Sequence, residues 1–139
     1  MMPHILIAED EPELVELYRS VFARSGFELS VASNGQEAVQ LARMLRPDLV
    51  LMDVMMPVMN GVEACRQLRA DPDLAAMRVV MLSSQCDARI RQAAQDAGAL
   101  DFWTKPISPR ELLAQVHSVL QQNRLPEPAL PRQQACQGV

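Results

Sequence analysis

Acidic side chains stand at the ends of two short apolar runs of the chain. Glu9 and Asp10 follow the run 4–8, and Asp53 closes the run 49–52. An ionised carboxylate at the end of a buried strand costs free energy unless cations, water or a chemical partner surround it. We therefore expect these three residues to bind a cation or to react.

Hydrogen-bond donors stand after two further apolar runs. Ser83 follows the run 78–82, and Lys105 comes shortly after the run 100–103. In an open parallel α/β sheet, ligands bind beyond the carboxyl ends of the strands. Any one of these polar residues alone is more simply interpreted as a helix cap, a solvated acid or a surface lysine. Their joint occurrence at four strand ends predicts a single site.

The charges and donors in this set are typical of magnesium-assisted phosphoryl transfer. Asp10 and Asp53 repel each other when held close together, and a hard divalent cation such as Mg²⁺ relieves that repulsion. Glu9 would bind the ion directly or through a water molecule. One oxygen of Asp53 then stays free to attack phosphorus and form an aspartyl phosphate, while Lys105 and Ser83 stabilise the phosphoryl oxygens.

Apolar runs alternate five times with segments of helical periodicity, which predicts an α/β fold. We expect a flavodoxin-like, doubly wound sheet of five parallel strands in the order 2-1-3-4-5, with five helices covering its two faces. The expected strands are His4–Ala8, Phe27–Ala32, Leu49–Met52, Arg78–Leu82 and Leu100–Trp103.

Helical spacing of apolar residues marks the segments between the strands. The first two helices are expected to bury Leu14, Leu17, Tyr18, Val21, Phe22, Ala38, Leu41, Ala42 and Leu45. A capping box from Ser33 and Gln36 would begin the second helix, and another from Ser108 and Glu111 would begin the fifth. The fourth helix, around 87–97, has a thin apolar face, which predicts weak docking and easy displacement.

Composition limits the class of protein. The chain has 139 residues, 49% of them hydrophobic, and a formal net charge of -4, which favours one domain that binds neither nucleic acid nor membranes directly. We expect this domain to span residues 1–122 and a Pro-rich tail or linker to occupy 123–139. The N-terminal residues have no signal-peptide pattern, so we expect a cytoplasmic location. The three cysteines lack the spacing of a metal site.

Taken together, the motifs resemble the receiver domain of bacterial two-component response regulators over about residues 4–122. The matching residues are Glu9, Asp10, Asp53, Met56, Pro57, Asn60, Gly61, Ser83, Lys105 and Pro106. The resemblance implies that Asp53 accepts a phosphoryl group from a histidine kinase or a phosphotransfer protein. It implies that the backbone carbonyl of Met55 is a further Mg²⁺ ligand and that the Lys105–Pro106 bond is cis.

The same resemblance implies a conformational switch. Ser83 would move toward the phosphoryl group and Phe102 would turn inward behind it, repacking the face formed by the fourth helix, the fifth strand and the fifth helix. That face would bind a downstream effector protein or a second copy of the chain. Three residues depart from the common pattern, because Ser83 replaces Thr, Phe102 replaces Tyr, and Met55 replaces a polar residue. The lifetime of the phosphoryl bond therefore stays open.

We expect a phosphoacceptor switch that catalyses only its own phosphorylation and dephosphorylation, and not an enzyme with an external substrate. An alternative is the receiver half of a longer DNA-binding transcription regulator, since segment 108–113 resembles the corresponding helix of winged-helix regulators. A third hypothesis is a metal-dependent phosphatase with an Asp nucleophile. Against it, Met55 stands where such enzymes carry a second Asp.

Overall fold

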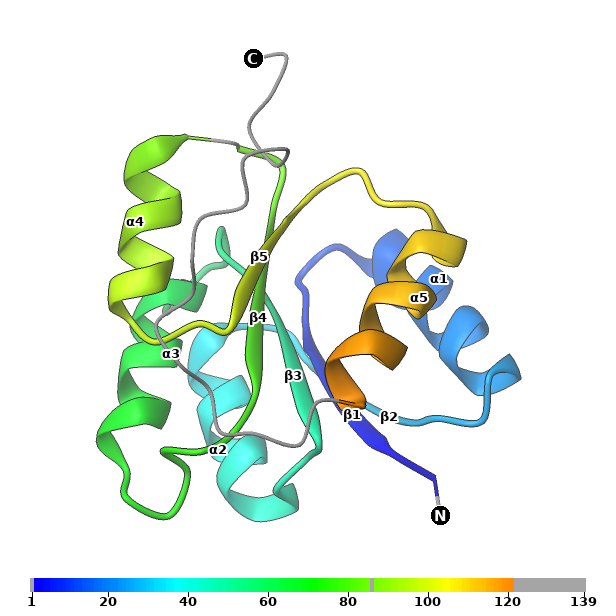
Figure 1. Cartoon of the computed structure of the whole chain (residues 1–139), viewed down its shortest axis with the longest axis horizontal. Coiled ribbons are helices and arrows are strands. Elements are labelled where there is room, and N and C mark those ends of the chain that lie inside the picture. The colour runs from blue at the N-terminus through cyan, green and yellow to red at the C-terminus, as the bar shows by residue number, and fades with distance from the viewer. Residues whose placement is uncertain (1, 86, 122–139) are drawn as a thin grey trace.

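The computed structural model describes residues 2–85 and 87–121 and shows a parallel sheet between two layers of helices (Figure 1). The strands are β1 (His4–Ala8), β2 (Glu28–Ala32), β3 (Leu49–Asp53), β4 (Val79–Ser83) and β5 (Asp101–Thr104). The helices are α1 (Pro12–Arg24), α2 (Gly35–Leu45), α3 (Gly61–Ala70), α4 (Ala88–Asp96) and α5 (Pro109–Leu120). The strand order β2-β1-β3-β4-β5 confirms the expected fold, and each strand begins and ends within one residue of its predicted bounds.

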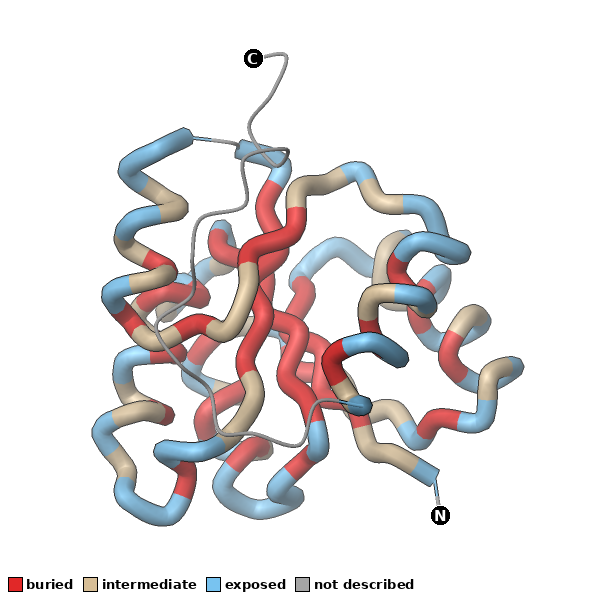
Figure 2. The backbone as a smooth tube through the Cα atoms, viewed as in Figure 1, coloured by how far each residue is buried: buried red, intermediate tan, exposed pale blue. Residues whose placement is uncertain are grey.

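Side chains of the strands alternate between two cores, one on each face of the sheet. Helices α1 and α5 cover one face, and α2, α3 and α4 cover the other (Figure 1). Leu51 packs with Phe22 of α1 in the first core, whereas its neighbour Val50 packs with Ala38 of α2 in the second. Because β3 and β4 are buried along their whole length (Figure 2), polar groups of these strands lie at their ends.

Helix α1 buries fewer side chains than its sequence predicts. Tyr18 and Phe22 are buried, whereas Leu17 is 42% exposed, so the prediction of a buried Leu17 is wrong. Tyr18 and Phe22 lie one turn apart and face the sheet, and Leu17 lies about 100° around the helix from Tyr18. After the helix, Gly26 has a φ of 80°, the left-handed conformation expected of a glycine that follows a helix.

Helix α2 begins one residue later than predicted. The cap is Asn34, whose Oδ1 accepts a hydrogen bond of 2.8 Å from the backbone N of Glu37. The predicted pair of Ser33 and Gln36 is therefore wrong. The carboxylate of Glu37 instead reaches back to the backbone N of Ser33 at 2.7 Å and to its hydroxyl at 3.2 Å.

The later start of α2 changes which of its side chains face the sheet. The buried residues are Gly35, Ala38, Val39 and Ala42. Leu41 is half-buried and packs against the core, whereas Leu45 is 36% exposed, so the expectation that Leu45 lies in the core is wrong. Small residues fill most of this face, which allows α2 to approach the sheet closely.

Helix α4 packs through a small apolar face and is tied to α3 at its C-terminal end. Ala94 is the buried residue of the helix itself, and Ile90 and Ala93 are half-buried against the core, which confirms the thin apolar face. Just beyond the C-terminal end, the carbonyl of Gly98 accepts a hydrogen bond of 2.9 Å from Nε of Arg69 on α3. This hydrogen bond ties the C-terminal end of α4 to α3.

The Arg69 guanidinium also ties α3 to the loop before β4. Its Nη1 donates to the carbonyls of Ala75 and Met77, and its Nη2 is buried without a hydrogen-bond partner. Burial lowers the pKa of Arg69, and the charge of Cys65 opposes that effect. A cation fixed to three carbonyls in this way serves as a structural clamp.

Among residues 2–85 and 87–121, no helix is both long and apolar enough to cross a membrane. Cys65 is buried, and its thiol donates to the carbonyl of Ala97 at 3.4 Å, which fits a structural role. Cys86, Cys136 and the tail 123–139 lie outside the part of the chain that the structure describes.

The N-terminal cap of α5 matches the predicted capping box. The hydroxyl of Ser108 accepts a hydrogen bond of 3.1 Å from the backbone N of Glu111, and it contacts the Glu111 carboxylate at 3.1 Å. These contacts satisfy a backbone donor that would otherwise lack a partner at the start of the helix.

Replacing Ser108 by Ala is expected to lower the free energy of unfolding by about 1 kcal/mol, because the cap is lost. Urea denaturation followed by circular dichroism measures the change. Ser20→Ala, at an exposed position within α1, is the matched control and should leave stability unchanged or slightly raised. Equal effects of the two substitutions would contradict the capping role.

Candidate functional site

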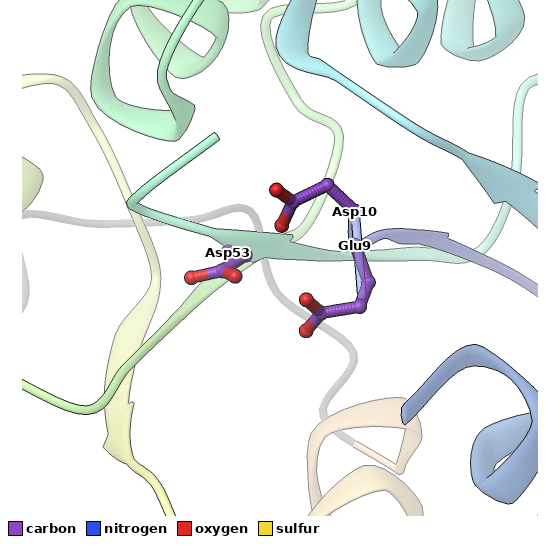
Figure 3. Close-up of side chains that lie close together, drawn as sticks. All are labelled: Glu9, Asp10 and Asp53. Carbon is purple, nitrogen blue, oxygen red and sulfur yellow. The ribbon is translucent and has the colours of Figure 1, made fainter. Parts of the chain in front are cut away.

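Three carboxylates meet at the carboxyl ends of β1 and β3. These strands are neighbours, with Ala8 paired to Met52, so the residues just beyond each pair lie side by side. Figure 3 shows Glu9, Asp10 and Asp53 gathered around a common space. One carboxylate oxygen from each residue lies within 4.8 Å of those from the other two.

Burial differs sharply among the three carboxylates. Glu9 is 1% exposed and Asp53 is 5% exposed, whereas Asp10 is exposed to solvent. Burial raises the pKa of Glu9 above 4.5, and a hydrogen bond from Lys105 opposes that effect. Such burial of acidic groups at a strand end is typical of a functional site.

Lys105, which directly follows β5, supplies the positive charge at this site. Its Nζ donates to Oε1 of Glu9 at 2.8 Å and to Oδ2 of Asp53 at 3.1 Å. It is the sole lysine among the thirteen Lys and Arg residues of the sequence. The expected cis peptide bond lies between Lys105 and Pro106.

The protonation of Lys105 depends on these two carboxylates. Burial disfavours its charge, but hydrogen bonds and charges from Glu9 and Asp53 outweigh that effect and raise the pKa above 10.5. Lys105 therefore carries its charge at neutral pH, and it pairs with the two buried acids while Asp10 faces solvent.

Ser83 and Phe102 lie on the strands next to this group. Ser83 is fully buried at the end of β4, where its hydroxyl accepts a hydrogen bond of 3.0 Å from the backbone N of Gln85. Phe102 is buried in the core under α4, and the guanidinium of Arg91 lies 5.9 Å from its ring centroid. The residue expected to turn inward is thus inward in this structure.

Met55 joins the site through its backbone. Its N–H donates to Oδ1 of Asp53 at 3.3 Å, while its side chain is 56% exposed. Together with the Lys105 contact, each oxygen of the Asp53 carboxylate therefore has a donor. The backbone from Asp53 to Met55 thus takes part in orienting the carboxylate.

Two glycines position the loop between β3 and α3. The N–H of Gly61 donates to the carbonyl of Val54 at 3.0 Å, and a Cβ at Gly61 would lie 2.3 Å from the carbonyl oxygen of Asp53. The N–H of Gly35 donates to the carbonyl oxygen of Met59 at 2.9 Å, and a Cβ at Gly35 would lie 2.2 Å from that oxygen of Met59. Both contacts exclude a side chain.

The role of Gly35 and the proximity of Tyr18 to the acidic site were not identified from the sequence. The Asn34-Gly35 pair signals a turn or helix start, but nothing in the sequence indicates that Met59 packs against it. Tyr18 was expected in the core, and it is buried there. Burial raises its pKa, and the charges of Lys105, Glu9 and Asp53 also influence it, which places the tyrosine near the acidic site.

The residues present fit a hard divalent cation. Carboxylate and carbonyl oxygens are the ligands that Mg²⁺ prefers, and Glu9, Asp10 and Asp53 offer one oxygen each within a small space. Lys105 places a single positive charge against three carboxylates, so the group keeps an excess of negative charge. Exposed Asp10 gives this group an open side toward solvent.

Comparison with known proteins identifies a family model and curated relatives that match most of this chain. A family model for the response regulator receiver domain matches residues 5–117. The DNA-binding response regulator MtrA of Mycolicibacterium smegmatis is 40% identical over 129 residues, which are 93% of this chain and 55% of MtrA. The chain therefore spans about half the length of the curated relatives it matches.

Solved structures show the same fold. A receiver domain of a signal transduction histidine kinase from Syntrophus aciditrophicus has a TM-score of 0.80 and 34% identity, covering 92% of this chain and 97% of that one. The receiver domain of a sensor histidine kinase from Pseudomonas aeruginosa has a TM-score of 0.81 and 25% identity, covering 88% and 100% of the two chains. That protein has a magnesium ion coordinated in its active site cleft.

Gly61→Ala is expected to lower the free energy of unfolding by about 3 kcal/mol, because the new methyl group would displace the backbone of Asp53. Gly26→Ala is the control, since no atom lies within 4 Å of a Cβ there and its cost is that of the left-handed conformation, about 1 kcal/mol. Urea denaturation compares the two variants. Equal losses would show that Gly61 is not constrained by Asp53.

The raised pKa of Lys105 predicts a pH dependence. Stability from its ion pairs is complete below pH 10.5, the ordinary lysine value, and is lost as pH rises through the higher folded value. NMR titration of the single lysine ε-carbon, in chelator, should give a midpoint above 10.5 that falls in Glu9→Gln. Glu13→Gln, on exposed α1 surface, should leave it unchanged, and an equal fall in both would contradict the assignment.

Proposed function

The chain belongs to the family of response regulator receiver domains, and from this we propose that Asp53 is its phosphoacceptor. The observation that carries the proposal is the pairing of buried Asp53 with Lys105 beside Glu9 and Asp10. A carboxylate that is oriented by donors on both oxygens and close to fixed positive charge is prepared to attack phosphorus.

The proposed reaction transfers a phosphoryl group from a phosphohistidine of a histidine kinase or a phosphotransfer protein. An oxygen of Asp53 forms the new P–O bond as the P–N bond of the donor breaks. The electron pair of that bond goes to the imidazole nitrogen, and the neutral imidazole is completed by a proton from solvent water. Lys105 neutralises charge on the phosphoryl oxygens, and Ser83 donates its hydroxyl to one of them.

Glu9, Asp10, Asp53 and the backbone carbonyl of Met55 would hold Mg²⁺, which when bound would offset the negative charge of the carboxylates and the incoming phosphoryl group. Glu9 and Lys105 also form an ion pair with each other in the metal-free protein. Their contact at 2.8 Å holds both side chains inside the site. The chain's own residues thus define the place of the phosphoryl group before it arrives.

The proposed output is a change at the face formed by α4, β5 and α5. Ser83 would turn toward the phosphoryl group, and Phe102, buried next to α4, would couple that movement to the face. The thin apolar face of α4, from which weak docking is predicted, supports this role. A downstream effector protein, or a second copy of the chain, would bind there, in the cytoplasm and without direct contact to nucleic acid or membrane.

A second proposal keeps the same phosphoacceptor and changes the output. The relative MtrA is a regulator about twice as long as this chain, and its name describes it as DNA-binding. The chain would then be the receiver part of a transcription regulator. The genomic reading frame that encodes it distinguishes the two outputs.

The test of Asp53 uses a small phosphodonor with Mg²⁺ and intact-mass measurement. Wild type should gain one phosphoryl adduct, and Asp53→Asn should gain none. Asp73→Asn, at an exposed position before β4, is the matched control and should label as wild type does.

Chelation provides the second arm of this experiment. Excess chelator should reduce labelling of wild type by at least about tenfold, because the excess negative charge of the site then repels the donor. Equal labelling of wild type and Asp53→Asn would assign the acceptor elsewhere. Undiminished labelling in chelator would remove the magnesium proposal alone.

A further inference from the structure

A pocket of about 370 Å³ lies between the loop after β3, helix α3 and helix α4. These two helices are neighbours on the same face of the sheet (Figure 1). The carboxylates of Glu9, Asp10 and Asp53 do not line it. The pocket is therefore separate from the acidic site, although Val54 and Met55 belong to both neighbourhoods.

The pocket combines an apolar wall with a cationic rim. Val54 and Val62 are buried, and Ile90 and Ala93 of α4 are half-buried. The polar part of the lining comes from Asn60, the carboxylate of Glu63 and two guanidinium groups, those of exposed Arg66 on α3 and Arg89 on α4. A volume of this size is at the lower end of those that bind small organic ligands.

The charges at the rim favour an anion. Arg66 of α3 forms a salt bridge of 3.6 Å with Glu63 one turn earlier. Arg89 of α4 forms no salt bridge with any carboxylate in the described part of the chain. The rim thus keeps one uncompensated positive charge beside an apolar wall.

We propose that this pocket binds a small organic anion, with its apolar body against Ile90 and Ala93 and its carboxylate, sulfonate or phosphate group at Arg89. Binding would bury the half-exposed side of α4 against α3 and the β3–α3 loop. A guanidinium that lacks a carboxylate partner gains most from such an anion, because no internal ion pair has to break.

The pocket connects to the acidic site through one short stretch of backbone. Met55 lines the pocket with its exposed side chain, while its N–H donates to Oδ1 of Asp53 at 3.3 Å. The opposite wall belongs to α4, in which Ala94 is the buried residue. An occupant therefore touches both the residue that orients Asp53 and a helix with a thin apolar face.

An anion in this pocket would regulate the position of α4 and, through it, partner binding. This inference rests on the proposed phosphorylation of Asp53. An occupant that bridges α3 and α4 stabilises the position of α4 seen here. If phosphorylation displaces α4, it lowers the affinity for the anion, and by thermodynamic reciprocity the anion lowers the affinity of the phosphorylated form for its partner.

Binding of 1-anilinonaphthalene-8-sulfonate, an apolar fluorophore with one sulfonate, tests the site directly. Fluorescence titration of wild type should saturate at one equivalent. Ala93→Trp, which fills the pocket, should weaken binding by more than about tenfold, and Arg89→Gln by about threefold.

Controls on the opposite face of the sheet separate a site from general stickiness. Ala114→Trp and Arg110→Gln are exposed changes on α5 and should leave the titration unchanged. Non-saturating binding, or equal weakening by Ala93→Trp and Ala114→Trp, would overturn the proposal. Because Ala93→Trp could disturb folding, amide NMR shifts of wild type are recorded as well. They should map to α3, α4 and the β3–α3 loop, and shifts confined to α1 and α5 would also overturn it.

The regulatory step has its own readout. Asp53→Asn should bind the fluorophore as tightly as wild type, so the pocket can be tested whether or not Asp53 is the phosphoacceptor. Phosphorylated wild type should bind it more weakly by about threefold or more. Unchanged affinity after verified phosphorylation would overturn the regulatory step and leave the binding site intact.

Discussion

Two buried carboxylates need compensating charge, and Lys105 provides it from 96 residues away in the sequence from Glu9. Burial of an unpaired charge has a large desolvation free energy, so the ammonium of Lys105 must lie beside the two carboxylates. This requirement constrains the fold. β1 and β3 must be adjacent for Glu9 and Asp53 to meet, and β5 must end on the same edge for Lys105 to reach them. The strand order β2-β1-β3-β4-β5 satisfies both conditions and leaves Asp10 facing solvent.

Backbone contacts then fix the one loop on which the acidic group depends. Gly61 allows the start of α3 to touch the carbonyl of Asp53, and Gly35 allows the start of α2 to touch Met59. Each of these glycines is the first residue of its helix, and an Asn caps the helix directly before it. Val58, in the same loop, is 76% exposed and has a φ of 69°, a conformation that costs a β-branched residue free energy. The backbone contacts of Gly35 with Met59 and of Gly61 with Val54 hold the loop on either side of it.

Much of this arrangement could be predicted from the sequence, because apolar runs of strand length and polar residues at their ends are local signals. The strand order and the Ser108 cap follow the prediction, and the structure places Glu9, Asp10, Asp53 and Lys105 in one group. The roles assigned to those residues stay predictions. The contact of Gly35 with Met59 was missed because it joins distant segments that periodicity does not report. The Asn34 cap is a local contact, and it was missed because Ser33 offered a competing cap one residue earlier. The exposure of Leu17 depends on how α1 is rotated against the sheet, which periodicity does not fix.

The hydrogen bond from Arg69 to Gly98 fixes the C-terminal end of helix α4 to α3. A helix of nine residues is about 14 Å long and stiff. If α4 pivots at that hydrogen bond, its first turn, close to the segment that follows Ser83, travels farther than its last turn. The surface that α4 presents near β4 would therefore be displaced most.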